Sequence, residues 1–173
     1  MTDQLKTIQS SSSRGYFGIG VEGISKPMNL GNLFRSAHAF GASFVFTIDS
    51  PYSPDLAKSD TSKSSKHLPL YKFRSSLELL LPDDCSLVGV ELLEEAFELP
   101  SFRHPRRAAY VLGPEKGSLS SGLLARCDSV VKIPTRFCVN VAMAGAIIMY
   151  DRALNFGDFR PRPVCAGHGI HKE

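Results

Sequence analysis

The segment GIGVEG, residues 18–23, decides which kind of α/β fold this chain can adopt. Its glycine spacing, G-x-G-x-x-G, is typical of dinucleotide-binding folds, where the glycines form the turn between a strand and the helix that directly follows. Here ISKPMN follows Gly23, so we expect the helix to begin only at Asn29, with Pro27 in the gap. Glycines that far from the helix N-terminus cannot hold a pyrophosphate there. We therefore interpret the first two glycines as strand residues whose small size permits close packing.

Short apolar runs and helical patterns alternate on both sides of that segment. The run SFVFTI, residues 43–48, is continuously apolar apart from its polar Ser and Thr, as in strands buried on both faces of a parallel sheet. We expect further strands at 16–21, 85–92, 108–113 and 129–134, and helices at 29–41, 75–81, 119–127 and 140–156. This alternation predicts an α/β fold with a mostly parallel sheet flanked by helices.

The length of 173 residues is that of one ordinary domain. We expect a disordered polar tail at 1–14, a single domain at 15–160 and a second tail at 161–173. The first residues lack the apolar core of a signal peptide, and no apolar run approaches the roughly 18 residues of a membrane span. We therefore expect a cytoplasmic protein that does not contact a membrane.

Net charge and the spacing of cysteines and histidines indicate whether an anionic partner or a metal ion is to be expected. The 20 Lys and Arg residues against 17 Asp and Glu leave a net charge of +3, which permits an anionic partner without demanding one. The four cysteines form no C-x-x-C pair and the five histidines no H-x-x-x-H pair. This spacing predicts reduced thiols and no metal site.

Three stretches lie at the ends of expected strands and helices. They are NLGNLFRSAHAFGA at 29–42, YVLGPEKGSLS at 110–120, and KIPTRFCVNVAMAGAIIMYDRA at 132–153. Their order and spacing resemble the three motifs of the SPOUT superfamily, specifically its SpoU/TrmH-like branch of RNA ribose methyltransferases. The matching residues are, in chain order, Asn29, Gly31 and Arg35; Gly113 and Glu115; and Ile133, Pro134 and Asn140.

The resemblance implies an activity, a cofactor and a C-terminal deep trefoil knot. The implied reaction is methylation of a ribose 2′-hydroxyl of tRNA or rRNA, with S-adenosylmethionine (SAM) bound in the knot. SAM carries no phosphate, so its site needs backbone amides and apolar walls. The strand ends at Val90, Gly113 and Ile133 would supply these at the carboxyl edge of the sheet, where open α/β sheets bind ligands.

The resemblance also implies a homodimer whose active site spans the interface. We expect that interface to involve the helices that follow Asn29 and Asn140. Gly145 costs the second helix about 1 kcal/mol relative to alanine, and close approach of another helix would explain it. Packing on the chain's own sheet is the alternative explanation.

By resemblance, Arg35 matches the arginine that activates the ribose hydroxyl. A guanidinium stays protonated in proteins, so a role as a general base is physically awkward. Anchoring an RNA phosphate and stabilising a developing alkoxide by charge suits Arg35 better. Asn29 and Asn140 either orient Arg35 or the ribose, or cap their helices.

The third motif departs from the family pattern. It carries Cys138-Val139-Asn140 where Ser-Leu-Asn is common, and only TRF separates the Ile-Pro pair from this triplet. A thiol is a weak hydrogen-bond partner, but backbone contacts from Cys138 and Val139 to the cofactor would remain. Two alternatives follow from the departure: a covalent role for Cys138 in base methylation, and a catalytically silent RNA-binding scaffold.

Basic residues in expected loops are candidates for RNA contact. We expect contacts from two groups, which a dimer would double around a shared cleft: Lys58, Lys63, Lys66 and Arg74; and Arg103, Arg106 and Arg107. Glu115 either contacts RNA or a partner loop, or accepts a hydrogen bond from the backbone.

Overall fold

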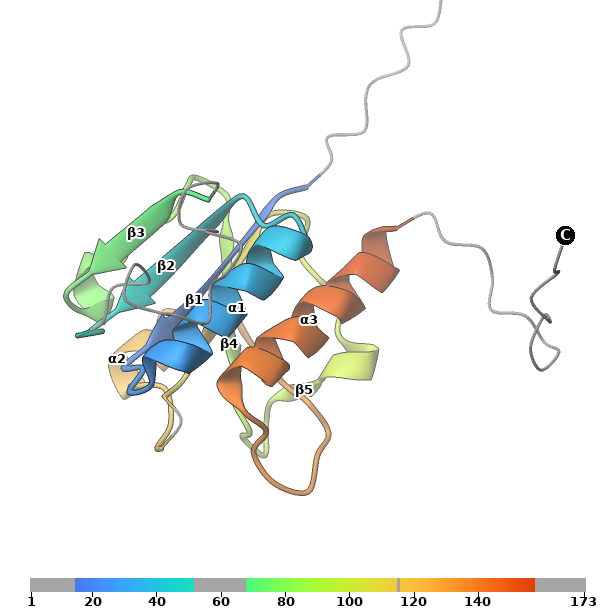
Figure 1. Ribbon diagram of the computed structural model, residues 1–173. Helices are drawn as coiled ribbons and strands as arrows, with labels where there is room; N and C mark the ends of the chain where they lie inside the picture. The colour runs from blue at the N-terminus through green and yellow to red at the C-terminus, as the bar shows by residue number, and fades with distance from the viewer. Residues whose placement is uncertain (1–14, 52–67, 115, 158–173) are drawn as a thin grey trace, which may run out of the picture.

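The computed structural model describes residues 15–51, 68–114 and 116–157, and its centre is a seven-stranded sheet in which every neighbouring pair of strands is parallel (Figure 1). The strand order is β3-β2-β1-β6-β4-β7-β5. The strands are β1 Phe17–Glu22, β2 Phe44–Ile48, β3 Leu70–Phe73, β4 Ser86–Val90, β5 Phe97–Glu98, β6 Ala108–Leu112 and β7 Ser129–Lys132. The predicted α/β class with a parallel sheet is confirmed.

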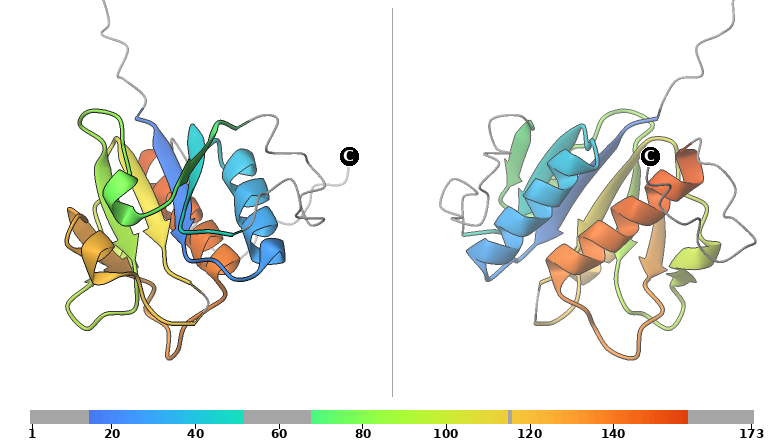
Figure 2. Two further views of the ribbon diagram at one scale, coloured as in Figure 1. Left: turned by 90° about the vertical axis from the view of Figure 1, so that its left-hand side faces the viewer. Right: turned by 45° about the vertical axis from the view of Figure 1, so that its right-hand side comes forward.

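The helices are α1 Pro27–Ala39, α2 Ser121–Leu124 and α3 Val141–Phe156, with 3-10 turns η3 Ser76–Glu78 and η4 Leu99–Ser101. Helices α1 and α3 lie side by side on one face of the sheet, and the short α2 and η3 lie together on the other (Figure 2). None of the described helices is long and apolar enough to cross a membrane.

The first two glycines of GIGVEG, Gly18 and Gly20, are strand residues, as predicted. A Cβ added to Gly18 would lie 2.2 Å from the Phe44 ring, and one added to Gly20 would lie 2.4 Å from the Phe46 ring. Both rings belong to the neighbouring strand β2, so only glycine lets strand β1 accept them. The segment therefore packs the sheet and forms no phosphate-binding turn.

Gly145 has a similar role between the two long helices. A Cβ at this position would lie 2.2 Å from Cδ1 of Leu33, on α1 of the same chain. The close helix approach that we expected between subunits is therefore made within the chain. Gly145 carries no argument for a dimer.

Several boundaries differ from expectation. Helix α1 begins at Pro27 and not at Asn29. Proline is favoured at the first position of a helix, because the N–H that it lacks would have no intrahelical partner there. The expected helices at 75–81 and 119–127 shorten to single turns, and the edge strands β3 and β5 were not expected. The predicted tails at 1–14 and 161–173 lie outside the described residues, as do Lys58, Lys63, Lys66 and Glu115.

Candidate active site

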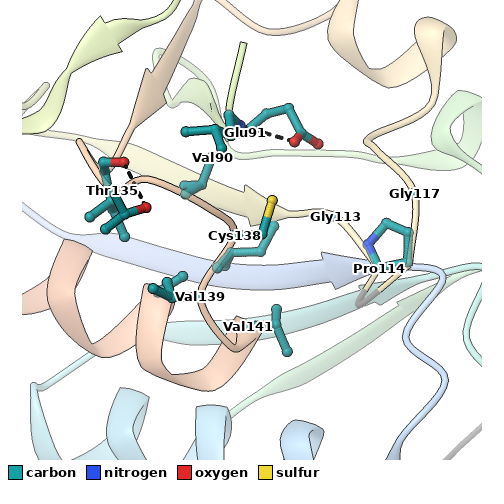
Figure 3. Close-up of a pocket in the computed structure, with 13 residues that line it drawn as sticks. Val90, Glu91, Gly113, Pro114, Gly117, Thr135, Cys138, Val139 and Val141 are labelled. Carbon is teal, nitrogen blue, oxygen red and sulfur yellow. Dashed lines mark hydrogen bonds between the residues drawn. The ribbon is translucent and has the colours of Figure 1, made fainter.

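A pocket opens at the carboxyl ends of β4, β6 and β7, beside the first turn of α3 (Figure 3). All five residues that we predicted to contact a cofactor lie in its lining: Val90, Gly113, Ile133, Cys138 and Val139. The remaining lining residues are Glu91, Leu92, Leu112, Pro114, Gly117, Thr135, Val141 and Ala144. Three segments far apart in the sequence thus converge on one hollow.

Two strand-end carboxylates hold the loop between β6 and α2, which forms one wall of this pocket. Oε2 of Glu22, at the end of β1, accepts a hydrogen bond from the Ser120 amide at 2.7 Å. Its Oε1 accepts a second from the Ser120 hydroxyl at 2.6 Å. Oε2 of Glu91, just after β4, accepts one from the Leu119 amide at 2.9 Å. Charge-assisted bonds of this kind are stronger than neutral ones, so the loop is held firmly.

Bare backbone forms the pocket wall at Gly113. A Cβ there would lie 3.2 Å from Oε2 of Glu91 and 3.2 Å from the Leu119 nitrogen, which is tighter than ordinary contact. A side chain at this position would press on the same loop that the two carboxylates hold. The glycine therefore keeps the backbone accessible at the strand end, as the second motif led us to expect.

The loop after β7 closes on itself through Thr135. Its amide donates to the Ile133 carbonyl at 2.7 Å, and its hydroxyl donates to the Phe137 carbonyl at 2.9 Å. Cys138 follows with an exposed side chain that lines the pocket. The short TRF segment thus forms a compact turn at the rim.

Asn140 and Asn29 join the two long helices. Oδ1 of Asn140 accepts from the amides of Ala142 and Met143 at 2.9 and 3.4 Å, which makes Asn140 the N-cap of α3. Its Nδ2 donates to Oδ1 of Asn29 at 3.0 Å. Asn29 is buried in the first turn of α1, whose N-cap is Lys26, so Asn29 is not a capping residue. Capping is thus confirmed for Asn140 and excluded for Asn29. A role of either asparagine in orienting Arg35 or the ribose stays a prediction.

Arg35 lies on the exposed face of α1, outside the pocket lining. The same helix buries Leu33, Phe34 and Ala37, so packing does not require an arginine at this position.

The basic residues predicted to contact RNA lie at two different edges of the sheet. Arg74 follows the carboxyl end of β3, on the pocket side, whereas Arg103, Arg106 and Arg107 precede β6 at the opposite edge. Within one chain the second group therefore lies away from the pocket.

A buried polar network occupies that opposite edge. The Arg152 guanidinium donates to the carbonyls of Pro105 and Arg106 at 2.6 and 2.7 Å and to the Tyr110 hydroxyl at 3.2 Å. The His104 ring contacts the Tyr110 hydroxyl at 2.6 Å and the Asp151 carboxylate at 2.9 Å.

Burial governs the titration of this network. It lowers the pKa of His104 despite the opposing effect of Asp151, and it raises the pKa of Tyr110 to about 12. His104 is therefore neutral at physiological pH. None of these residues was singled out from the sequence.

The electrostatics of the pocket favour a ligand without phosphates. Of the described lining residues, only Glu91 is charged, and the others offer apolar side chains, backbone groups, a hydroxyl and a thiol. A carboxylate repels phosphate but tolerates a neutral or cationic group. Within the described residues, no cluster of three or more His, Cys, Asp or Glu side chains is arranged to hold a metal ion.

The family follows from a comparison over most of the chain. The model of the SpoU rRNA methylase family matches residues 17–150, which span all three motifs and the pocket. The chain belongs to the SpoU rRNA methylase family. The resemblance noted in the sequence is therefore confirmed.

Two curated relatives of this SpoU-family chain are tRNA methyltransferases. A mouse tRNA (guanosine(18)-2′-O)-methyltransferase, TARBP1, is 28% identical over 137 residues, or 74% of this chain and 9% of the relative. The tRNA (guanosine(18)-2′-O)-methyltransferase of Borreliella burgdorferi is 27% identical over 142 residues, or 79% of this chain and 65% of the relative. The chain thus spans less than two thirds of either relative.

Solved structures share the SpoU fold. An AdoMet-bound rRNA methyltransferase from Sinorhizobium meliloti superposes with a TM-score of 0.72 at 19% identity, over 82% of this chain and 57% of that one. A protein from a study of 2-OH methylation of C/U34 on tRNA superposes with a TM-score of 0.68 at 25% identity. That alignment covers 82% of this chain and 97% of the other, so the two are of similar extent.

Proposed function

We propose that this SpoU-family protein transfers a methyl group from SAM to a ribose 2′-hydroxyl of tRNA or rRNA. One observation carries the proposal: the five residues chosen from the second and third motifs line a single pocket at the carboxyl edge of the sheet. The first-motif helix is tied to the same region through the bond between Asn140 and Asn29. The two relatives whose names specify 2′-O-methylation of tRNA support the same reaction.

The residues of the pocket fit SAM in chemical type. Apolar walls from Val90, Leu112 and Ile133 suit an adenine ring, and strand-end amides and carbonyls near Gly113 suit its polar edge. The single carboxylate, Glu91, suits a ligand with positive charge. SAM would supply an electrophilic methyl group on a cationic sulfur.

Residues of the chain would hold the pocket wall in place, bind the RNA and stabilise the charge that develops in the reaction. Glu22 and Glu91 hold the wall of the pocket through their bonds to Ser120 and Leu119, so that backbone groups there are preorganised. Arg35 would hold a phosphate of the RNA with its planar guanidinium. It would also stabilise negative charge on the ribose oxygen, where a fixed charge contact is worth on the order of 3 kcal/mol in the barrier.

The family resemblance extends the proposal to a trefoil knot in the C-terminal part of the chain and to a cytoplasmic homodimer. Two observations support a dimer through α1 and α3. Met143 and Tyr150, seven residues apart on α3, expose 59% and 55% of their surface, and Met28 on α1 exposes 66%. Large exposed apolar residues on two adjacent helices are typical of an interface.

The test is incubation of the protein with methyl-labelled SAM and total RNA, followed by digestion and nucleoside mapping. We expect label in 2′-O-methylated nucleosides. Label in a methylated base would instead favour base methylation, with the exposed Cys138 as the first residue to replace. SAM binding without transfer to any RNA would favour a silent scaffold.

A further inference from the structure

One large aromatic side chain, Phe137, lies at the rim of the pocket and takes no part in the proposed methyl-donor site. Phe137 exposes 76% of its surface, although Thr135, two residues before it, and Cys138, directly after it, both line the pocket. Phe137 itself is not part of the lining, so its ring lies outside the space proposed for SAM. Exposing a phenyl ring to water is unfavourable, and ligand binding would relieve this.

The backbone presents this ring from a defined turn. The Thr135 hydroxyl donates to the Phe137 carbonyl at 2.9 Å, and the Thr135 amide donates to the Ile133 carbonyl at 2.7 Å. These bonds restrict residues 133–137, so a ligand that binds the ring loses less conformational freedom than on an unrestrained loop.

Positively charged side chains near Phe137 favour an anionic ligand. Arg136 precedes Phe137 and is exposed, and Lys116, exposed in the loop after β6, lies at the same edge of the sheet. An exposed aromatic ring beside cations is the combination with which proteins hold unstacked bases of single-stranded RNA, the ring stacking on a base and the cation meeting a phosphate.

We propose that Phe137 stacks on a nucleobase of the RNA next to the methylated ribose, with Arg136 holding an adjacent phosphate. The proposal rests on the proposed function, since it takes the pocket to be the methyl-donor site. In this proposal the loop holds a base that has swung out of the RNA stack. The neighbouring ribose would then lie at the mouth of the pocket.

The chain contains no tryptophan, which allows a test by fluorescence. Phe137→Trp introduces a single indole at the rim. Phe40→Trp is the matched control, because Phe40 follows the last residue of α1 at the opposite edge of the sheet and is also exposed. The probes are unfractionated tRNA, ribosomal RNA and inorganic polyphosphate, a polyanion without bases.

We expect tRNA or rRNA to quench the indole fluorescence of Phe137→Trp strongly, polyphosphate to quench it little, and the Phe40→Trp control to respond to neither. Phe137→Ala should lower kcat/KM for RNA by roughly tenfold, and Phe137→Tyr should restore it. Calorimetric SAM affinity and the light-scattering mass should stay unchanged in all variants.

Other outcomes overturn the proposal. Equal quenching by polyphosphate means a charge effect without stacking. A response to SAM alone, with weaker SAM binding by Phe137→Ala, means that the ring belongs to the cofactor site. A changed mass means a subunit interface. If RNA quenches Phe137→Trp but the wild type methylates no RNA, stacking stands and the proposed function fails.

Discussion

The two edges of the sheet use buried polar groups in different ways. The amino edge, where the amino ends of the strands lie, holds a network of side chains that hydrogen-bond to one another and to the carbonyls of 105–106: Arg152, His104, Tyr110 and Asp151. At the carboxyl edge, Glu22 and Glu91 bond to one loop and leave a pocket lined largely by apolar groups and backbone. Charge at the amino edge stabilises the fold, and charge at the carboxyl edge shapes a site.

This difference explains why the position of buried charged side chains does not by itself indicate where the ligand site lies. The network at the amino edge holds the more strongly buried charge, with Arg152 only 5% exposed. Its hydrogen bonds, however, join protein groups to each other and leave no hollow lined by these groups among the described pockets. A ligand site needs groups that are held in place and remain accessible, as at Gly113 and Cys138.

Arg152→Met should have the largest effect on stability. It would leave the part-buried carbonyls of 105–106 and the buried Tyr110 hydroxyl without this donor, and each group left unpaired costs about 1–3 kcal/mol. We expect a loss of at least about 3 kcal/mol, or roughly 10 °C in Tm. Calorimetric affinity of the remaining folded protein for S-adenosylhomocysteine should stay within about threefold; a much larger loss would mean that the two edges are coupled.

Arg35→Ala should have the largest effect on activity. We expect methyl transfer to fall about 10²- to 10³-fold, because one preorganised charge contact is lost, while SAM affinity is nearly unchanged. Arg35→Lys keeps the charge without the planar fork and should recover only a small part of the rate. Single-turnover rates on a verified RNA would measure this, and a wild-type rate for Arg35→Ala would remove Arg35 from the mechanism.

The sequence predicted the elements whose signal is local. The strands β1, β2 and β6 are continuous buried runs, and α3 follows the only asparagine that caps a long described helix. The edge strands β3 and β5 escaped because they are short and partly exposed, and their pairing is decided by the neighbouring strand. Pocket residues were found because the motifs mark strand ends.

The residues that hold the pocket loop and those of the network at the opposite edge were missed for a different reason. Glu22 lies inside the segment GIGVEG, but its partner Ser120 is 98 positions away. His104 lies in an irregular basic segment, and its partner Asp151 is 47 positions away. Hydrogen bonds between side chains so distant in sequence leave no periodic pattern, so only the folded structure reveals them.

Glu22→Gln should have a moderate effect, and mainly on the pocket. Glutamine keeps one acceptor oxygen but loses the charge that strengthens both bonds to Ser120. We expect S-adenosylhomocysteine affinity to fall about tenfold, equivalent to about 1.4 kcal/mol. Glu95→Gln, an exposed carboxylate after β4, is the control and should bind as the wild type does. Unchanged binding by Glu22→Gln would mean that the loop needs no such support.

The smallest effect is the pH dependence of stability from the amino edge. Burial lowers the pKa of His104, so the unfolded chain takes up this proton at a higher pH than the folded one. The stabilising contribution is complete above the unfolded pKa of about 6.5 and is lost as the pH falls from there toward the folded pKa. Thermal melts between pH 7.5 and 5 should therefore show a shallower decline for His104→Gln than for the wild type. Equal slopes would contradict this assignment.

Hydrogen exchange with and without S-adenosylhomocysteine tests most directly whether the carboxyl edge binds the ligand and the amino edge only stabilises the fold. The ligand should slow amide exchange in 90–92, 113–114, 116–120 and 133–139, at and beside the pocket walls, and leave 103–107 unchanged. Slowed exchange confined to the amino edge, or no change anywhere at saturating ligand, would contradict it.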